Sequence, residues 1–170
     1  MPVGLFFTGG VESTLLLHQL SKQDAVLQLY TVLNPYINVE RMQQIISYVN
    51  MNNKVTVNFP FTIPLKNPET DKDRTFIRWA RHLAQVEVDM LYIGSNEHMD
   101  HLPKRQYLIH DKIIMPFKGL QKDKIVEMYK HEGLTELLKM THSCFIDSTD
   151  HCGKCIGCIE RTWAFERNTI

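Results

Sequence analysis

The stretch that decides the fold is FFTGGVEST, residues 6–14, close to the start of the sequence. It overlaps an apolar run at residues 3–7, which is typical of a short buried strand. It leads into LLLHQL, whose leucines give residues 12–21 the pattern of a helix. Between the two stand Gly9 and Gly10, with three hydroxyl side chains close by. Such a join is either a tight turn with a capped helix or a cradle for phosphate groups.

The start of a helix is chemically suited to a phosphate. The first-turn amides have no backbone partner, and the partial positive end of the helix dipole lies behind them. An anion therefore fits there, and Gly9 and Gly10 let the backbone approach it closely. Thr8, Ser13 and Thr14 would donate hydroxyls to the same oxygens. The stretch lacks the Lys-Ser/Thr ending of a Walker A loop and the third glycine of the dinucleotide fingerprint.

Strands and helices alternate along the chain outward from this join. Strands are predicted at residues 3–7, 25–33, 54–59, 90–93 and 112–115, and helices at residues 12–21, 39–50, 73–86, 121–131 and 134–139. Three prolines predict a loop over residues 60–70. The alternation predicts an α/β fold, an open parallel sheet of about five strands with helices on both faces. Ligands of such sheets bind beyond the carboxyl ends of the strands.

The composition narrows the function classes. Of 170 residues, 44% are apolar and 22% charged, which is ordinary for a globular protein. Lys plus Arg and Asp plus Glu both number 19, so the formal net charge is zero, which argues against a direct nucleic-acid partner. No apolar run is long enough to cross a membrane. The N-terminus lacks the basic segment of a signal peptide, so we expect a cytoplasmic protein.

All the cysteines lie near the end of the sequence. Their spacing is C-x7-C-x2-C-x2-C, at Cys144, Cys152, Cys155 and Cys158. Two-residue intervals let neighbouring sulfurs converge on one ion, and four thiolates form a closed, structural zinc site. Similar spacing also occurs in iron–sulfur ligation, and His151 could replace one sulfur. The sequence predicts a structural Zn²⁺ site with these alternatives open.

The glycine stretch resembles a known signature. TGGVEST is similar to the Ser-Gly-Gly-x-Asp-Ser motif of the PP-loop ATP pyrophosphatases, with Thr8 in place of Ser and Glu12 in place of Asp. The resemblance implies that ATP binds with Mg²⁺, that the loop holds the pyrophosphate end, and that a substrate oxygen attacks the α-phosphate. The residues implied to bind the nucleotide are Thr8, Gly9, Gly10, Glu12, Ser13 and Thr14. Glu12 would hold the magnesium.

A PP-loop that precedes this cysteine pattern resembles the 7-cyano-7-deazaguanine synthase family of the queuosine pathway. The tail HSCFIDSTDHCGKCIGCIERTWAF matches at Ser143, Cys144, Cys152, Gly153, Cys155, Cys158, Arg161 and Phe165. The segment PFKGLQKDKI matches a family pattern with Lys122 at the lysine position, and the resemblance implies that Lys122 stabilises the charge that develops during the reaction. Other matching positions imply substrate contacts at Arg74, Gly94, Asn96 and Asp100. The family's Tyr-Pro-Asp-Cys-Arg stretch survives only as Pro103 and Arg105.

The resemblance implies an ATP-dependent carbon–nitrogen ligase. It would adenylate 7-carboxy-7-deazaguanine and use ammonia to form 7-cyano-7-deazaguanine through an amide. Two alternatives stay open: a PP-loop enzyme that acts on another acid or a tRNA base, and an inactive nucleotide-binding module. We expect residues 1–140 to form the ATP-binding domain and residues 141–170 to form a zinc-binding tail packed on it. Family members often associate, so a homo-oligomer also stays open.

Overall fold

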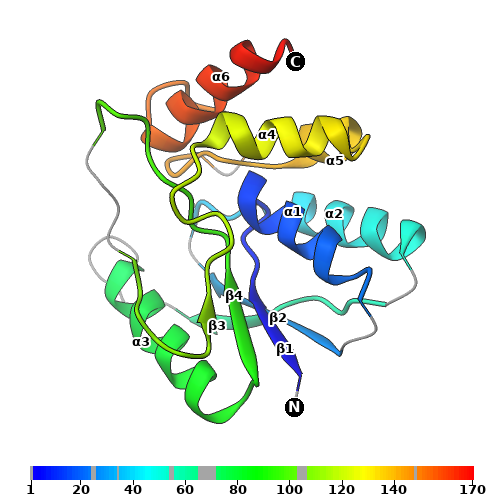
Figure 1. Ribbon diagram of the computed structural model, residues 1–170, viewed down its shortest axis with the longest axis vertical. Helices are drawn as coiled ribbons and strands as arrows, with labels where there is room; N and C mark the ends of the chain where they lie inside the picture. The colour runs from blue at the N-terminus through cyan, green and yellow to red at the C-terminus, as the bar shows by residue number, and fades with distance from the viewer. Residues whose placement is uncertain are drawn as a thin grey trace.

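The computed structural model describes residues 2–23, 26–33, 35–53, 56–64, 72–102, 107–147 and 149–170, without the side chains at 33, 64 and 72–75. The elements run in the order β1 (Val3–Phe6), α1 (Val11–Leu20), β2 (Leu27–Leu33), α2 (Val39–Asn52), β3 (Phe61–Pro64), α3 (Lys72–Val86), β4 (Met90–Ile93), β5 (Ile113–Ile114), α4 (Lys122–His131), α5 (Thr135–Met140) and α6 (Ile156–Asn168) (Figure 1). None of these described helices combines the length and the apolarity needed to cross a membrane.

The strands form one parallel sheet in the order β3-β2-β1-β4-β5. The predicted parallel sheet of about five strands is confirmed. β1 lies at its centre, paired with β2 on one side and with β4 on the other. The connections after β1 and after β4 therefore leave the sheet at the same edge, beside one another. Ligands of open α/β sheets bind in the crevice that such diverging connections create.

Alternate residues of β1 face opposite sides of the sheet, as the pleat of a strand requires. Leu5 packs into a core cluster that includes side chains of α1, α2, α4, α5 and α6. Phe6 packs into a second cluster, to which α3 contributes Ala80, Leu83 and Ala84. Both strand faces are buried because helices cover both, which confirms the predicted layers.

The third strand lies further along the chain than its sequence pattern predicted. Among the described residues, 56–59 form no strand, so that part of the prediction at residues 54–59 is wrong, and β3 instead occupies part of the proline loop expected over residues 60–70. Residues 54–55 and 65–70 lie outside the described residues. The Asn50 side chain takes the role of a strand partner, since it donates to Val57 O at 2.9 Å and accepts from Val57 N at 2.7 Å. Pro60 has no N–H to donate, and ladder pairing with Tyr30 begins just after it, at Phe61. β3 is an edge strand, where proline is tolerated.

The C-terminal segment packs on the elements that precede it. Figure 1 shows α4, in yellow, and α6, in red, side by side at the end of the molecule toward which β1 runs. Arg167 Nε bonds Asp123 Oδ2 at 3.1 Å across these two helices. Upstream of α6, the backbone N–H of His142 donates to Gly9 O at 2.8 Å. The segment after α5 therefore touches the glycine loop directly, while the division at residue 140 stays a prediction.

Candidate active site and metal centre

The glycine loop between β1 and α1 has the conformation that its sequence predicts. Gly9 has φ of +73°, a region that side chains rarely adopt. Gly10 is the N-cap of α1 and is extended, with no side-chain cap hydrogen bond. Ser13 Oγ accepts from Thr8 N at 3.2 Å and donates to Gly10 O at 3.4 Å. The hydroxyls therefore brace the loop around the N-terminus of the helix.

The connection after β4 closes over the same helix end. A Cβ on Gly94 would lie 2.8 Å from Ser13 N and 2.9 Å from the Glu12 carbonyl carbon, so only glycine fits there. Two residues on, Asn96 is 1% exposed and its Nδ2 donates to Glu97 O at 2.8 Å. Its Oδ1 has no hydrogen-bond partner among the described residues. Asn96 therefore presents a buried acceptor at the crevice.

A buried group of charges lies beside the loop. Lys122 Nζ is 2.7 Å from Glu12 Oε1 and 3.9 Å from Glu160 Oε2, and all three side chains are at most 11% exposed. Lys122 is the first residue of α4, where the helix dipole disfavours a positive charge. Carboxylates must therefore compensate its ammonium, because an unpaired buried charge is very unfavourable. Glu12, in contrast, stands in the first turn of α1, where the dipole favours an anion.

Glu12 and Lys122 line a cavity of about 210 Å³ at the carboxyl end of the sheet. Its polar lining comprises Thr8, Gly10, Glu12, Gly94, Asn96, Lys122, His142 and Ser143, and its apolar lining includes Phe6, Val32, Ile37 and Phe76. Cys144 and Phe145 of the C-terminal segment complete the wall. The cavity thus has a charged side at the glycine loop and an apolar side formed by β1, β2, the segment before α2, and α3. Such a surface suits a ligand that carries both phosphates and an aromatic ring.

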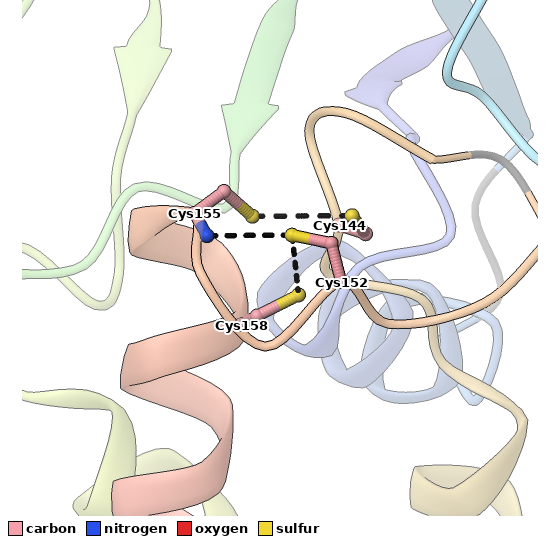
Figure 2. Close-up of side chains that lie close together, drawn as sticks. All are labelled: Cys144, Cys152, Cys155 and Cys158. Atoms are coloured by element: carbon pink, nitrogen blue, oxygen red, sulfur yellow. Dashed lines mark hydrogen bonds between the residues drawn. The ribbon is translucent and has the colours of Figure 1, made fainter.

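The four cysteines converge (Figure 2). Their sulfur atoms all lie within 4.8 Å of one another, and the Cys152–Cys158 and Cys144–Cys155 sulfurs are 3.9 Å apart. Four thiolates at a Zn–S distance of about 2.3 Å would have sulfurs about 3.8 Å apart in a tetrahedron. An iron–sulfur cluster holds some or all of its thiolates farther apart, because they bind different irons. The donor set therefore fits a single zinc ion.

Backbone N–H groups point at the sulfurs, which favours the thiolates that a metal needs. The N–H groups of Lys154 and Cys155 approach Cys152 Sγ at 3.4 and 3.3 Å, and they lower the pKa of that thiol to about 6. Gly153 adopts φ of +69° to make this turn. His151 is not drawn into the group, since its Nε2 accepts from Ser143 N at 3.4 Å. The described residues thus favour four sulfurs over three sulfurs and a histidine.

The structure brings most of the predicted site residues to one place. Gly9, Ser13 and Thr14 are not among the residues that line the cavity, and Thr14 is fully buried. Asp100 lies elsewhere: it is exposed, and its Oδ1 accepts from Gln121 Nε2 at 3.0 Å. The Arg74 side chain, like Pro103 and Arg105, lies outside the described residues. The roles assigned to all these residues stay predictions.

The sequence reasoning missed Glu160 and His142. Glu160 belongs to a set of buried α6 positions, Gly157, Glu160, Arg161 and Ala164. Their spacing of three, four and seven residues marks one helix face, so the pattern could have indicated that two charged residues are buried. His142 gave no such signal, because its position against Gly9 depends on tertiary structure.

Comparison with known proteins matches the part of the chain that carries the cysteines and part of the cavity lining. No curated protein matches the chain. Residues 87–169 match the family model described as queuosine biosynthesis protein QueC. This stretch contains Gly94, Asn96, Lys122 and all four cysteines, whereas the glycine loop lies before it. Over residues 87–169 the chain therefore matches the queuosine biosynthesis family QueC, as its resemblance to 7-cyano-7-deazaguanine synthase predicted.

Proposed function

We propose that this protein is an ATP-dependent ligase that converts 7-carboxy-7-deazaguanine and ammonia into 7-cyano-7-deazaguanine. One observation carries the proposal: the glycine loop and the QueC-matching segment line the same cavity. The loop is the part suited to phosphates, and the matched segment is the part that indicates the pathway. Their meeting at the edge of the sheet supports one active site built from both.

The residues of the loop are suited to the pyrophosphate end of ATP. The helices α1 and α4 both begin at the cavity. The positive ends of their dipoles, with the first-turn N–H groups of α1, therefore favour an anion there. Lys122 lies across from the loop and would compensate the charge that grows on the leaving pyrophosphate. Mg²⁺ bound with ATP would supply positive charge that compensates the phosphates. Glu12 is the carboxylate at the cavity that would hold it.

The proposed chemistry proceeds in two activations. A carboxylate oxygen of the acid attacks the α-phosphorus, the bond to the pyrophosphate breaks, and an acyl-adenylate forms. Ammonia then attacks the acyl carbon, and AMP leaves with the carboxylate oxygen, which gives the amide. A second ATP activates the amide oxygen in the same way, and loss of AMP and protons leaves the nitrile. The protein mainly orients the reactants and stabilises developing charge.

The zinc centre has a structural part in this proposal. Its ligand Cys144 lines the cavity together with His142 and Ser143, so a bound ion would fix that wall. Four protein ligands leave no open position for substrate or water. We therefore assign the centre no chemical step.

The proposal is tested by release of pyrophosphate from ATP, Mg²⁺ and ammonium, with and without 7-carboxy-7-deazaguanine. We expect release that depends on the acid, with the nitrile or the amide detected by mass spectrometry. Release that leaves the acid unchanged would keep the ATP site and exclude this substrate. Binding of ATP with no release at all would favour an inactive nucleotide-binding module.

A further inference from the structure

We propose that Glu160 is a positioning residue that holds Lys122 in place while Glu12 turns to the magnesium of bound ATP. This inference rests on the proposed function. It assigns a role to a carboxylate that no part of the sequence reasoning used. In the structure Lys122 Nζ lies nearer to Glu12, at 2.7 Å, than to Glu160, at 3.9 Å. That arrangement is the resting one, in which Lys122 pairs mainly with Glu12.

The two carboxylates differ in their access to the cavity. Glu12 and Lys122 line the cavity, and Glu160 is not among its lining residues. The Glu160 side chain is 1% exposed and reaches Lys122 from α6, behind the cavity wall. Only Glu12 is therefore placed to bind a cation that arrives with a ligand. Glu160 is placed to remain with the lysine.

The energetics of burial explain why a second carboxylate is needed. If Glu12 turned to a magnesium ion, Lys122 would be left at the N-terminus of α4, where the helix dipole repels it. A buried ammonium without a carboxylate is strongly destabilised. Glu160 removes that penalty, so Glu12 can exchange one cation for the other at little cost. A neutral residue at position 160 would leave Glu12 bound to the lysine.

Glu160 also connects this exchange to the metal centre. It follows the ligand Cys158 by two residues in the same helix, and the ligand Cys155 is the N-cap of that helix. The next residue, Arg161, donates to Thr141 Oγ1 at 2.6 Å and stacks on Phe165 with its guanidinium carbon 4.2 Å from the ring centroid. The start of α6 is thus fixed at several points, and Glu160 is fixed with it.

The test is calorimetric binding of ATP to zinc-loaded protein, in the presence of Mg²⁺ and in Mg²⁺-free buffer without a chelator. For Glu160→Gln we expect the affinity for Mg-ATP to fall about tenfold, the size of a typical coupling free energy. The affinity for ATP without Mg²⁺ should change by less than about twofold, because the neutral side chain affects only the exchange between cations. Glu166→Gln, an exposed position on the same helix, is the matched control and should change neither.

Two results for a folded Glu160→Gln protein would overturn the inference. Unchanged Mg-ATP affinity in a folded Glu160→Gln protein contradicts it. An equal loss with and without Mg²⁺ indicates a merely structural role and contradicts it as well. If Glu160→Gln does not fold, Glu160→Asp decides: it keeps the charge but is one methylene shorter, so it should lose affinity only for Mg-ATP, and unchanged Mg-ATP affinity in this variant contradicts the inference. If the wild-type protein binds no Mg-ATP, the proposed function itself fails.

Discussion

At the scale of single residues, Lys122 joins the two halves of the site. It comes from α4 yet pairs with Glu12 of α1, and both side chains are nearly inaccessible to solvent. Removal of the Lys122 ammonium would leave buried carboxylates without a counter-charge. In comparable buried ion pairs, loss of one partner lowers the free energy of unfolding by about 3 kcal/mol. Exposed pairs such as Lys124–Glu127, in contrast, contribute little to stability, because solvent screens their charges.

We therefore predict that Lys122→Met lowers the free energy of unfolding by about 3 kcal/mol. It should also reduce acid-dependent pyrophosphate release by about 100-fold, because a charge-stabilising group is lost. Urea unfolding and steady-state kinetics measure the two effects. Adding Glu12→Gln should recover much of the stability but none of the activity. The control Lys124→Met, exposed on the same helix, should behave like the wild type; equal effects from both lysines would contradict this account.

Gly94 allows a second prediction at the residue scale. A methyl group there would meet the backbone of Ser13 and Glu12, which cannot move without shifting the start of α1. We expect Gly94→Ala to lower stability by about 2 kcal/mol, as overpacking does, and to weaken ATP binding as well.

Gly119 gives the comparison for that variant. It has φ of +81°, and a Cβ added there would meet no heavy atom within 4 Å, so Gly119→Ala should cost about 1 kcal/mol from backbone strain alone. Thermal unfolding and ATP calorimetry of both variants distinguish the crowding expected in Gly94→Ala from the backbone strain expected in Gly119→Ala. ATP affinity that is weakened equally in both would argue against a special role for the Gly94 approach.

At the scale of elements, α6 depends on the cysteine centre at its start. Cys158 is buried within its first turn, and Cys155 precedes the helix. Metal-ligand free energy becomes folding free energy when the site forms only in the folded chain. We predict one zinc per chain by elemental analysis. Cys158→Ser should lose the metal and lower the melting temperature by about 10 °C, which corresponds to about 3 kcal/mol for a domain of this size. A metal-free protein that melts at the wild-type temperature would contradict this role.

The far end of α1 carries a buried histidine that should make stability depend on pH. His18 is 5% exposed, Asn53 Nδ2 lies 3.5 Å from its Nδ1, and Glu132 Oε2 lies 3.9 Å from its Nε2. Burial and then the charge of Lys22 lower the pKa of His18 below 6.5, although Glu132 acts in the opposite direction. The unfolded chain therefore binds the proton more tightly than the folded chain does. Stability should fall as the pH is lowered from 6.5 through the folded-state pKa.

His18→Gln tests that prediction. The variant should show a flatter dependence of unfolding free energy on pH just below 6.5 than the wild type does. Urea unfolding at a series of pH values measures the slope. The control is His131→Gln, whose side chain is 79% exposed. If the slope of His18→Gln equals that of the wild type, His18 is not the group responsible.

At the scale of the whole molecule, the sequence predicts the layers well because apolar spacing reports which faces are buried. The pattern fails at β3 for a physical reason. Apolar residues stand at alternate positions from 55 to 63, so one continuous alternation spans the predicted strand and the observed one. The part that pairs with β2 is decided by the Asn50 side chain, which bonds the backbone of Val57, and by Pro60, which has no N–H to donate. Periodicity reports neither of these.

The candidate site divides in the same way. The cysteine cluster and the glycine loop are local in sequence, so spacing alone indicates them. The association of Glu12, Lys122 and Glu160 is not local, since three helices far apart in sequence must pack before the charges meet. Resemblance to a family pointed to Glu12 and Lys122. The spacing along α6 could indicate only that Glu160 is buried, and the folded chain was needed to show that it lies beside Lys122.

The central claim is that a carboxylate is adenylated in the cavity between the glycine loop and the cysteine segment. The most direct test uses 7-carboxy-7-deazaguanine labelled with ¹⁸O in the carboxylate, together with ATP, Mg²⁺ and ammonium. Mass spectrometry of the products then locates the label. We expect ¹⁸O in AMP and none in pyrophosphate, with an unlabelled nitrile. AMP without ¹⁸O, or label that remains entirely in the unreacted acid, would contradict it.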